Sequence, residues 1–362
     1  MESMVRKTNM VDKLKIYKGK KVLITGHTGF KGSWLCIWLN SIGAEVIGIA
    51  LDPRTQEDNF VLSGVGNKIK EYREDIRNID AVEKIVNNEK PEILFHLAAQ
   101  PIVIGSYHDP ILTFETNTLG TAYLLEAFRK SETLKTGIFI TSDKCYDNKE
   151  WVWGYRESDP MGGHDPYSAS KGAAEIIIDS FRRSYFTDGE KKIASVRAGN
   201  VIGGGDWAPH RIIADCIKAI EQEKPIEIRN PLATRPWQHV LEPLGGYLFL
   251  GALMMEEGGY DEAWNFGPTN DNTKPVKVLV EELIRQYGFG SWEDKSNNNS
   301  QHEANLLSLD ISKAIQQLKW KPVLNFEETV EYTVEWYKKY KQDNVLNLCL
   351  NQIERYTNKW KS

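Results

Sequence analysis

The sequence predicts an α/β fold, in which a doubly wound parallel sheet is followed by a smaller α/β lobe. Two observations support this prediction. Up to Ala198, short and almost continuously apolar segments alternate with longer segments of helical periodicity, as is typical of a parallel sheet covered by helices on both faces. In addition, a glycine-rich turn separates the first apolar segment from the first helical one, which is how many βαβ units begin.

The individual elements follow from this alternation. We expect strands at 20–25, 45–51, 93–99, 137–141 and 193–198. We expect helices at 30–42, 80–89, 110–130 and 166–185, where Gly43 ends the first and Pro166 begins the last. Beyond Gly199, Gly, Pro and Trp become frequent and strand signals become short. Helical patterns persist there at 212–222, 241–255, 276–287 and 327–340.

Composition and charge argue against several function classes. The net charge of −5 lacks the basic excess of a nucleic-acid-binding domain. Residues 1–15 lack the apolar core of a signal peptide, and no apolar run is long enough to cross a membrane. The cysteines, Cys36, Cys145, Cys216 and Cys349, lack the spacing of a zinc site or a disulfide framework. We therefore expect a cytoplasmic protein that binds no metal, no nucleic acid and no membrane.

The stretch TGHTGFKG at 25–32 predicts a dinucleotide-binding turn. Its glycines let the chain turn tightly and let a pyrophosphate approach the helix N-terminus, where free N–H groups and the positive end of the helix dipole attract anions. The cofactor-binding candidates in this turn are Gly26, His27, Thr28, Gly29, Phe30, Lys31 and Gly32. Because the turn joins the first strand to the first helix, we expect a Rossmann-type unit.

Further cofactor contacts are expected at the ends of the next strands. Asp52 stands about twenty residues after the turn, where a carboxylate accepts hydrogen bonds from ribose hydroxyls and repels a 2′-phosphate. This favours NAD over NADP, although Arg54 argues in the opposite direction. Asp75 and Ile76 are candidates for contacts with the adenine. The segment Leu97-Ala98-Ala99 has mostly small side chains, which leave room for the cofactor to lie across the strand end.

Two units of unequal size are expected. Residues 1–198 form the predicted dinucleotide-binding domain, with segments near 236–260 returning to it, and residues 199–362 form most of the second lobe. The polar stretch 295–303 predicts an exposed loop. Residues 344–362 predict either a docked helix or a frayed tail.

A tyrosine and a lysine one helical turn apart predict proton-transfer chemistry. Tyr167 and Lys171 lie four positions apart near the start of a predicted helix and therefore share a face. A free tyrosine is a poor base at neutral pH, but a nearby ammonium favours the phenolate and lowers the pKa of the phenol. Such a tyrosine can take a proton from a sugar hydroxyl while hydride leaves for a nicotinamide.

Together these features resemble the extended short-chain dehydrogenase/reductase family. The resemblance covers nearly the whole chain and rests on TGHTGFKG (25–32), HLAAQ (96–100), TSDKCYDN (141–148), HDPYSASK (164–171), RAGNVIGGGDWAPHRIIADC (197–216) and RPWQHV (235–240). Within the family the chain is most similar to the nucleotide-sugar 4,6-dehydratases that act on CDP-glucose. The resemblance implies NAD as the cofactor, with Asn117 in its site, and a role in bacterial surface-polysaccharide synthesis. It also implies a homodimer or a dimer of dimers, paired through the helices at 110–130 and 166–185.

The resemblance assigns roles to the polar residues that follow the strand at 137–141. Ser142, Tyr167 and Lys171 would serve the oxidation of the sugar at C4. Asp143 and Lys144 would eliminate water across C5–C6, after which hydride returns to C6. We assign Asp143 as the acid at O6 and Lys144 as the base at C5. In the alternative, Lys144 stabilises the enolate and Tyr167 takes the C5 proton.

The expected substrate contacts come mainly from the second half of the chain. Asn200 is placed on the nucleotide diphosphate by the resemblance, and Arg211 and Arg235 are candidates for bidentate phosphate contacts. His239 either contacts the nucleotide or packs, and Trp207 either stacks on the base or packs. The remaining substrate candidates are Gln100 and Ser142.

Other functions stay open at this point. A different nucleotide-sugar 4,6-dehydratase or a 4-epimerase would share most of these residues, although the pair Asp143-Lys144 argues against a plain epimerase. A non-catalytic NAD-binding regulatory protein is the alternative from another class. The intact set of Ser142, Tyr167 and Lys171 argues against that alternative.

Overall fold

The computed structural model describes residues 10–296 and 306–361. Within them, the centre of the molecule is a seven-stranded sheet of order β11-β6-β5-β4-β1-β2-β3 in which neighbouring strands are parallel. The strands are β1 (Lys21–Thr25), β2 (Glu45–Ala50), β3 (Lys70–Arg73), β4 (Ile93–His96), β5 (Thr136–Ile140), β6 (Lys192–Arg197) and β11 (Ala263–Asn265). The strand order reverses between β1 and β4, which confirms the predicted doubly wound, Rossmann-type sheet.

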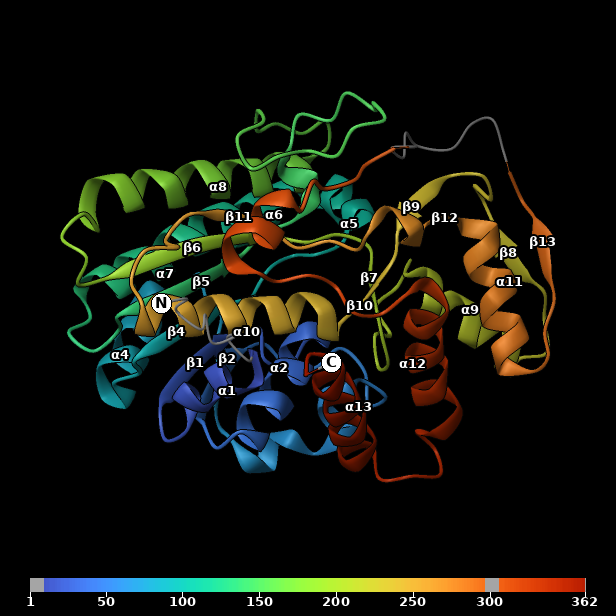
Figure 1. Cartoon of the computed structure of the whole chain (residues 1–362), viewed down its shortest axis with the longest axis horizontal. Helices are drawn as coiled ribbons and strands as arrows, with labels where there is room; N and C mark the ends of the chain where they lie inside the picture. Colours follow the sequence, from blue (N-terminus) through green and yellow to red (C-terminus); the bar gives the residue numbers. More distant parts are fainter. Residues whose placement is uncertain (1–9, 297–305, 362) are drawn as a thin grey trace, which may run out of the picture.

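Helices cover both faces of this sheet because its strands are apolar on both sides. Figure 1 shows α8 (Pro166–Tyr185) on one side and α10 (Leu241–Glu256) on the other. Val22 of β1 belongs to the core that includes α2 (Phe30–Ser41) and α10. Its neighbour Leu23 belongs to the opposite core, which includes α4 (Ile79–Glu89), α7 (Gly120–Lys130) and α8. Because the strands are parallel, their carboxyl ends meet at one edge of the sheet, between the two layers of helices.

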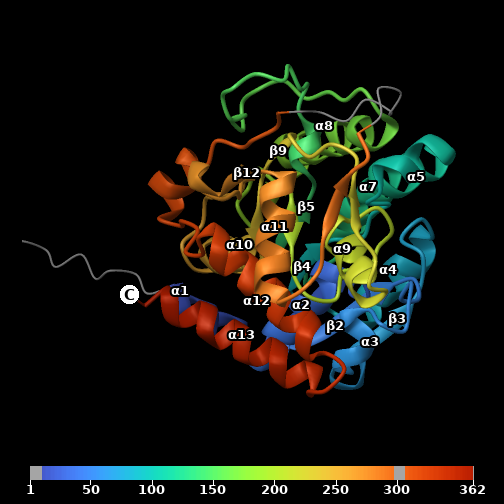
Figure 2. The same ribbon diagram turned by 90° about the vertical axis from the view of Figure 1, so that its right-hand side faces the viewer.

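The second half of the chain forms the other end of the molecule, at the right of Figure 1 and toward the viewer in Figure 2. Its helices are α9 (Ile212–Glu221), α11 (Val276–Tyr287) and α12 (Phe326–Lys339). Its strands are β7 (Val201–Ile202), β8 (Ile226–Ile228), β9 (Thr234–Pro236), β10 (Gln238–His239), β12 (Thr273–Pro275) and β13 (Trp292–Asp294). These strands pair as three short two-stranded ribbons, β7 with β10, β8 with β13 and β9 with β12.

The last helix ties the two halves together. α13 (Val345–Lys359) packs on α2 and on α3 (Asn59–Ser63), and Figure 2 shows it running beneath the molecule. Of the two alternatives for 344–362, the docked helix is therefore the one found. The remaining helices are α1 (Met10–Lys13), α5 (Val103–His108) and α6 (Pro110–Phe114).

Several predicted elements differ in detail. The predicted helix 110–130 contains a π-helical turn, Glu115–Leu119, between α6 and α7. The predicted strand 93–99 ends at His96, so the small residues after it form a loop. Lys295 and Ser296 are exposed, and the rest of the predicted loop 295–303 lies outside the described residues. Nor does any helix in the described part of the chain have the length and apolar character needed to cross a membrane.

Candidate active site

The glycine turn is packed so closely that side chains are excluded from it. Gly26 has φ +74°, and a Cβ there would lie 2.7 Å from the backbone N of Ala98. A Cβ on Gly32 would lie 2.1 Å from the carbonyl O of Gly26. Gly29 is the exposed N-cap residue of α2, so the N-terminus of this helix opens to solvent. The turn therefore fits the pyrophosphate of a dinucleotide.

The side chains of the turn anchor it to the sheet. His27 is fully buried, and its Nε2 lies 3.1 Å from the Glu71 carboxylate on β3, while burial lowers the pKa of the imidazole. Thr28 donates a hydrogen bond to the carbonyl of Leu51 at 2.9 Å. These contacts fix the turn against the ends of β2 and β3.

Lys31 and Phe30 face the second half of the chain. Burial lowers the pKa of Lys31 to about 8, and Arg211 acts in the same direction, whereas Asp143 acts to raise it. A Cβ on Gly203 would lie 3.1 Å from the Phe30 ring. The turn thus contacts the loop after β7. It is also close enough to Asp143 and Lys171 for their charges to affect the Lys31 pKa.

The acid at the end of β2 has the exposure that a ribose contact requires. The side chain of Asp52 is 86% exposed, and its carboxylate lies 3.1 Å from Nε of Arg73 on β3. Arg54 is also exposed. Sequence analysis missed Arg73, which also lies 3.0 Å from His27 Nε2, because β3 is a short polar edge strand with no apolar signal.

The other cofactor candidates line the edge between β3, β4 and α7. Asp75 accepts hydrogen bonds from the Arg77 guanidinium at 2.7 and 3.0 Å, and this contact holds the pKa of the carboxyl below its usual range. Ile76 is buried against Gly120, where a Cβ would come within 2.7 Å of its Cδ1 atom. Leu97, Ala98 and Ala99 are half-buried.

Asn117 fastens the loop after β4 to the helix that carries Tyr167. Its Oδ1 accepts from the backbone N of Gln100 at 2.8 Å, and its Nδ2 donates to the Gln100 carbonyl at 3.1 Å and to Ser170 Oγ at 2.9 Å. The Gln100 side chain bonds within its own loop, donating to Thr113 at 2.9 Å and accepting from Ile102 N at 2.6 Å. The Gln100 amide is thus held by neighbouring residues of its loop, and its contact with substrate stays a prediction.

The structure brings the predicted catalytic side chains together. Ser142 lies close enough to Tyr167 to influence its pKa, although one follows β5 and the other lies in the first turn of α8. Ser142 also donates to Asp143 Oδ1 at 3.0 Å and accepts from the backbone N of Lys144 at 3.2 Å. Tyr167, Lys171, Ser142 and Asp143 are buried, and Lys144 is half-buried.

Burial is the largest influence on the pKa values of Tyr167 and Lys171, both on α8. It raises the pKa of Tyr167, and the neighbouring Ser142 hydroxyl and the charge of Arg211 only partly oppose this effect. It also lowers the pKa of Lys171 to about 8, while Glu175 acts to raise it. The expected lowering of the Tyr167 pKa by Lys171 is thus not what the protein chain produces, because loss of hydration outweighs the neighbouring charges.

The carboxylate of Asp143 lies against a glycine that sequence analysis passed over. A Cβ on Gly199 would lie 1.7 Å from Asp143 Oδ2. Asn200, whose φ is +50°, lies next to it with Nδ2 at 3.5 Å from the same oxygen. The available signal was the glycine directly after β6, at the carboxyl edge of the sheet.

The arginine candidates differ in exposure. The Arg211 side chain is 45% exposed, with Nε 3.8 Å from Asp206 Oδ2. Arg235 on β9 is buried and donates to the Thr234 carbonyl at 2.9 Å. Burial raises the pKa of Asp206, which Arg211 opposes.

Two aromatic candidates lie in the core. His239 is fully buried between the rings of Trp34 and Tyr332, at centroid distances of 6.0 and 5.4 Å. Burial lowers its pKa to about 3, so the imidazole is neutral. Trp207 is buried and meets Tyr337 edge to face at 5.1 Å. Both side chains thus pack against aromatic rings, and their contact with a nucleotide stays a prediction.

The described residues contain no cluster of three His, Cys, Asp or Glu side chains that could hold a metal ion. Each of the four cysteines is buried with a free thiol. The polar chemistry of the site is therefore built from hydroxyl, carboxylate, ammonium and guanidinium groups.

Comparisons with known proteins agree with this geometry. A family model described as GDP-mannose 4,6 dehydratase matches residues 23–333. The chain belongs to this family. Among curated members of similar length, CDP-glucose 4,6-dehydratase from Salmonella typhimurium is 45% identical over 94% of this chain and 96% of its own. This finding confirms the predicted resemblance to nucleotide-sugar 4,6-dehydratases.

Solved structures of the 4,6-dehydratase and 4-epimerase types share the fold. UDP-glucose 4-epimerase from Thermotoga maritima, solved with UDP-glucose, has a TM-score of 0.76 at 25% identity and covers 89% of this chain and 100% of its own. dTDP-glucose 4,6-dehydratase from Bacillus anthracis, solved with NAD, has a TM-score of 0.75 at 21% identity and covers 91% of this chain and 100% of its own. The second likeness concerns the fold alone.

Proposed function

We propose that this protein is an NAD-dependent CDP-glucose 4,6-dehydratase, a hydro-lyase that forms CDP-4-dehydro-6-deoxy-D-glucose and water. The observation that carries the proposal is the contiguous, hydrogen-bonded set Ser142-Asp143-Lys144 beside Tyr167, in a chain 45% identical to a dehydratase of that name. An epimerase needs the hydroxyl and the tyrosine, whereas elimination needs an additional acid and base. The chain supplies both at the end of the same strand.

Oxidation at C4 requires that the proton of the C4 hydroxyl be removed. Tyr167 is the base, and the neighbouring Ser142 hydroxyl supports this role because it acts to lower the tyrosine pKa. The buried ammonium of Lys171, one helical turn away, favours the phenolate while the proton moves. Ser142 can at the same time hydrogen-bond the oxygen at C4.

Elimination requires that the C5 proton leave and that the C6 hydroxyl be protonated. The C4 ketone acidifies the C5 hydrogen, so that a lysine amine can remove it. Asp143 is buried beside Ser142 and Asn200, next to the hydroxyl proposed for the oxidation step. We assign Asp143 to O6 and Lys144 to C5.

NAD, when bound, supplies the hydride acceptor at C4 and the hydride donor at C6, so it is regenerated in each cycle. The residues that would hold it are the glycine turn at the N-terminus of α2, Asp52 at the end of β2, and Asn117 beside α8. Asp52 repels a 2′-phosphate, which favours NAD over NADP. Arg211, Arg235 and Asn200 are proposed to hold the nucleotide diphosphate.

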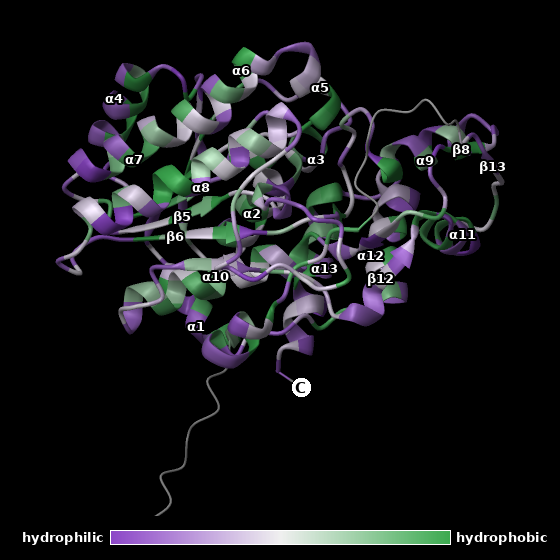
Figure 3. Ribbon diagram, turned by 90° about the horizontal axis from the view of Figure 1, so that it is seen from above, coloured by the Kyte–Doolittle hydropathy of each residue, from purple (hydrophilic) through white to green (hydrophobic). Residues whose placement is uncertain are grey.

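We further propose that the protein forms a homodimer through α6, α7 and α8. α6 and α7 each pack on α8, and large apolar side chains are exposed on α6, on the π-helical turn after it and on α8, namely Ile111, Leu119, Ile176 and Tyr185. Figure 3 shows apolar residues on α6 and α8 on the face turned to the viewer. The four reduced cysteines support a cytoplasmic location. Light scattering after size exclusion tests the dimer, and a monomeric mass would contradict it.

The nucleotide preference is tested by incubating the protein with NAD and, separately, CDP-, dTDP-, GDP- and UDP-glucose or the matching mannose. We expect a 4-keto-6-deoxy product from CDP-glucose, without net NADH. Turnover of only another nucleotide sugar would overturn the substrate assignment and leave the reaction class in place. Release of a C4 epimer without loss of water would overturn the reaction class.

A further inference from the structure

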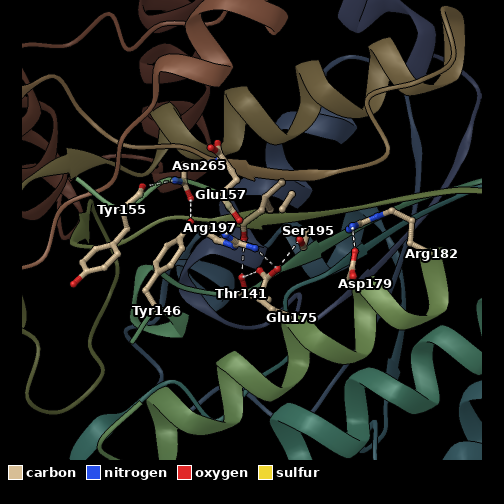
Figure 4. A network of polar contacts seen from close by, with 12 residues as sticks. Thr141, Tyr146, Tyr155, Glu157, Glu175, Asp179, Arg182, Ser195, Arg197 and Asn265 are labelled. Carbon is tan, nitrogen blue, oxygen red and sulfur yellow. Dashed lines mark hydrogen bonds and ion pairs between the residues drawn. The ribbon is translucent and has the colours of Figure 1, made fainter. Parts of the chain in front are cut away.

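A buried ion pair adjoins the strand end that carries Ser142, Asp143 and Lys144. Glu175 on α8 and Arg197 at the end of β6 are each 4% exposed, and Arg197 Nη2 lies 2.7 Å from Glu175 Oε2. Figure 4 shows Glu175 pointing from the helix toward Arg197, Thr141 and Ser195. Neither charged residue belongs to the catalytic set derived above.

The pair is bonded to both ends of the catalytic segment 142–145. Thr141 Oγ1 donates to Glu175 Oε1 at 2.5 Å, immediately before the segment. Arg197 Nη1 donates to the hydroxyl of Tyr146 at 2.5 Å, immediately after it, and the guanidinium carbon lies 4.9 Å from the centre of that ring. Because both flanking residues are fixed to one ion pair, the four side chains between them have little freedom to shift.

The Glu175–Arg197 pair is also linked through α8 to the redox residues Tyr167 and Lys171. Glu175 follows Lys171 by four positions and Tyr167 by eight on α8, so all three share a helix face. A movement of Glu175 relative to β6 would therefore change the distance between Tyr167 and Ser142. A buried ion pair adds little net stability compared with apolar residues of the same volume. The main effect of the Glu175–Arg197 pair is therefore to fix the positions of the residues bonded to it.

We infer that the Glu175–Arg197 pair is a positioning element that holds the elimination residues in register with Tyr167, and that its Glu175 carboxylate places a negative charge one helical turn from Lys171. The inference rests on the proposed dehydratase activity, which it deepens. In this role Glu175 and Arg197 touch no substrate and act through Thr141, Tyr146 and Lys171.

The charged groups around Lys171 decide whether removal of the Glu175 charge raises or lowers the Lys171 pKa. Glu175 faces it from the same helix, Cys145 from the catalytic segment, His96 from β4 and Lys31 from α2. Burial raises the pKa of the Cys145 thiol and lowers that of His96 to about 3, so both are neutral, and Lys31 is a cation. Glu175 is thus the anion among these neighbours, and removing its charge lowers the pKa of Lys171.

The first test is Glu175→Gln with Glu175→Asp as the charge-preserving control. We expect kcat to fall by roughly 10- to 100-fold in Glu175→Gln with a smaller change in KM, because the reacting groups are misplaced. We also expect the alkaline limb of the pH–kcat profile to move to lower pH, by on the order of one unit. Glu175→Asp should retain the wild-type profile.

A second measurement does not depend on turnover. The 13Cε resonance of Lys171, identified by its loss in Lys171→Met, is titrated by NMR in protein without added substrate. The wild-type group should titrate near the pKa of about 8, and the Glu175→Gln group at lower pH. An unchanged titration in folded Glu175→Gln would overturn the electrostatic part of the inference.

A matched pair of milder variants covers the case in which Glu175→Gln does not fold. Thr141→Val and Ser195→Ala each remove one hydrogen bond to the Glu175 carboxylate, of 2.5 and 2.8 Å, and leave the ion pair in place. Only Thr141 adjoins the catalytic segment, so Thr141→Val should lower kcat while Ser195→Ala leaves kcat unchanged. Equal effects of the two would overturn the positioning role. A wild-type protein without turnover of any nucleotide sugar would instead refute the proposed function, and the NMR titration would still test the inference.

Discussion

At the scale of single residues, the carboxylate of Asp143 has room only because residue 199 has no side chain. A Cβ on Gly199 would overlap Asp143 Oδ2, and the Ser142 hydroxyl and Asn200 amide hold the carboxylate from other sides. The position of Asp143, the proposed elimination acid, thus depends on the lack of a Cβ atom at Gly199. This acid also lies one residue from the hydroxyl that serves oxidation, so small shifts can separate the two half-reactions.

We therefore expect Gly199→Ala to uncouple oxidation from elimination. The added methyl displaces Asp143 but leaves Tyr167 and Lys171 on α8 in place, so reduced nicotinamide should accumulate while dehydration falls by about 100-fold. Single-turnover absorbance and product analysis check this. The matched control is Gly105→Ala, where the nearest atom to the new Cβ is 3.6 Å away. Wild-type dehydration by Gly199→Ala would contradict the steric argument.

The base at C5 is a separate prediction. Lys144→Met keeps the length of the side chain and removes its amine, so hydride transfer to NAD should persist while exchange of the C5 hydrogen with solvent is lost. The exchange is followed by NMR in deuterated water. Normal exchange in Lys144→Met would instead assign C5 deprotonation to Tyr167.

Much of this residue-level site was predictable because its parts are contiguous motifs. TSDK and YSASK each place several functional groups within one strand end or one helical turn, and their spacing carries the chemistry. Gly199, Thr141 and Glu175 were missed because their roles depend on contacts between β5, β6 and α8 that no local pattern encodes. The burial of His239 and the local hydrogen bonds of Gln100 could not be predicted, since neither is visible in the sequence.

At the scale of elements, the first turn of α8 carries the redox tyrosine and depends on its cap. Asp165 accepts from the backbone N of Ser168 at 2.9 Å and from its hydroxyl at 2.6 Å, and Pro166 begins the helix. The predicted bounds of this helix were correct because both signals are local. β3 and β11 were missed because one is polar and the other has only three residues, so each becomes a strand through its neighbour in the sheet.

Asp165→Ala is expected to lower the free energy of unfolding by about 1 kcal/mol and also to lower kcat, because the frayed turn contains Tyr167. Asn325→Ala is the matched control: Asn325 caps α12 through the Glu328 backbone N at 2.8 Å, and α12 carries none of the proposed catalytic residues. Urea unfolding and steady-state kinetics should show equal losses of stability in the two variants but a loss of kcat only in Asp165→Ala. Equal kcat values would contradict the coupling.

At the scale of the whole molecule, Glu242 connects three distant parts of the chain. It begins α10, and its carboxylate accepts hydrogen bonds from Val323 N at 2.8 Å, Leu324 N at 2.7 Å and Tyr356 of α13 at 2.7 Å. Burial raises its pKa to about 7. The helix that closes the molecule is therefore held in place by a carboxyl group that titrates near neutrality.

This raised pKa makes stability depend on pH. The folded protein binds the Glu242 proton more tightly than the unfolded chain does, so protonated Glu242 contributes to the free energy of unfolding. This stabilisation is fully present below the unfolded pKa of about 4.3. It is lost as the pH rises to the folded pKa of about 7. Compared with Glu242→Gln, the wild type should lose on the order of 3 kcal/mol of unfolding free energy across that window. Urea unfolding at several pH values measures the difference, and a constant difference would contradict the assignment.

The division of the chain into two lobes at Gly199 stays a prediction, whereas the doubly wound sheet is confirmed. The sheet was predictable because its strands are continuously apolar and its helices periodic, up to β6. The later segments were harder to place because α10 and α13 pack against the first half only through contacts distant in sequence.

The central claim is an internal oxidation, elimination and reduction on one sugar, and an isotope experiment tests it directly. CDP-glucose labelled with deuterium at C4 is converted by the protein and NAD in ordinary water, and the product is examined by NMR. We expect the deuterium at C6 of the 4-keto-6-deoxy product. Deuterium that remains at C4 of a product still bearing its C6 hydroxyl, or that is lost to solvent, would contradict the account.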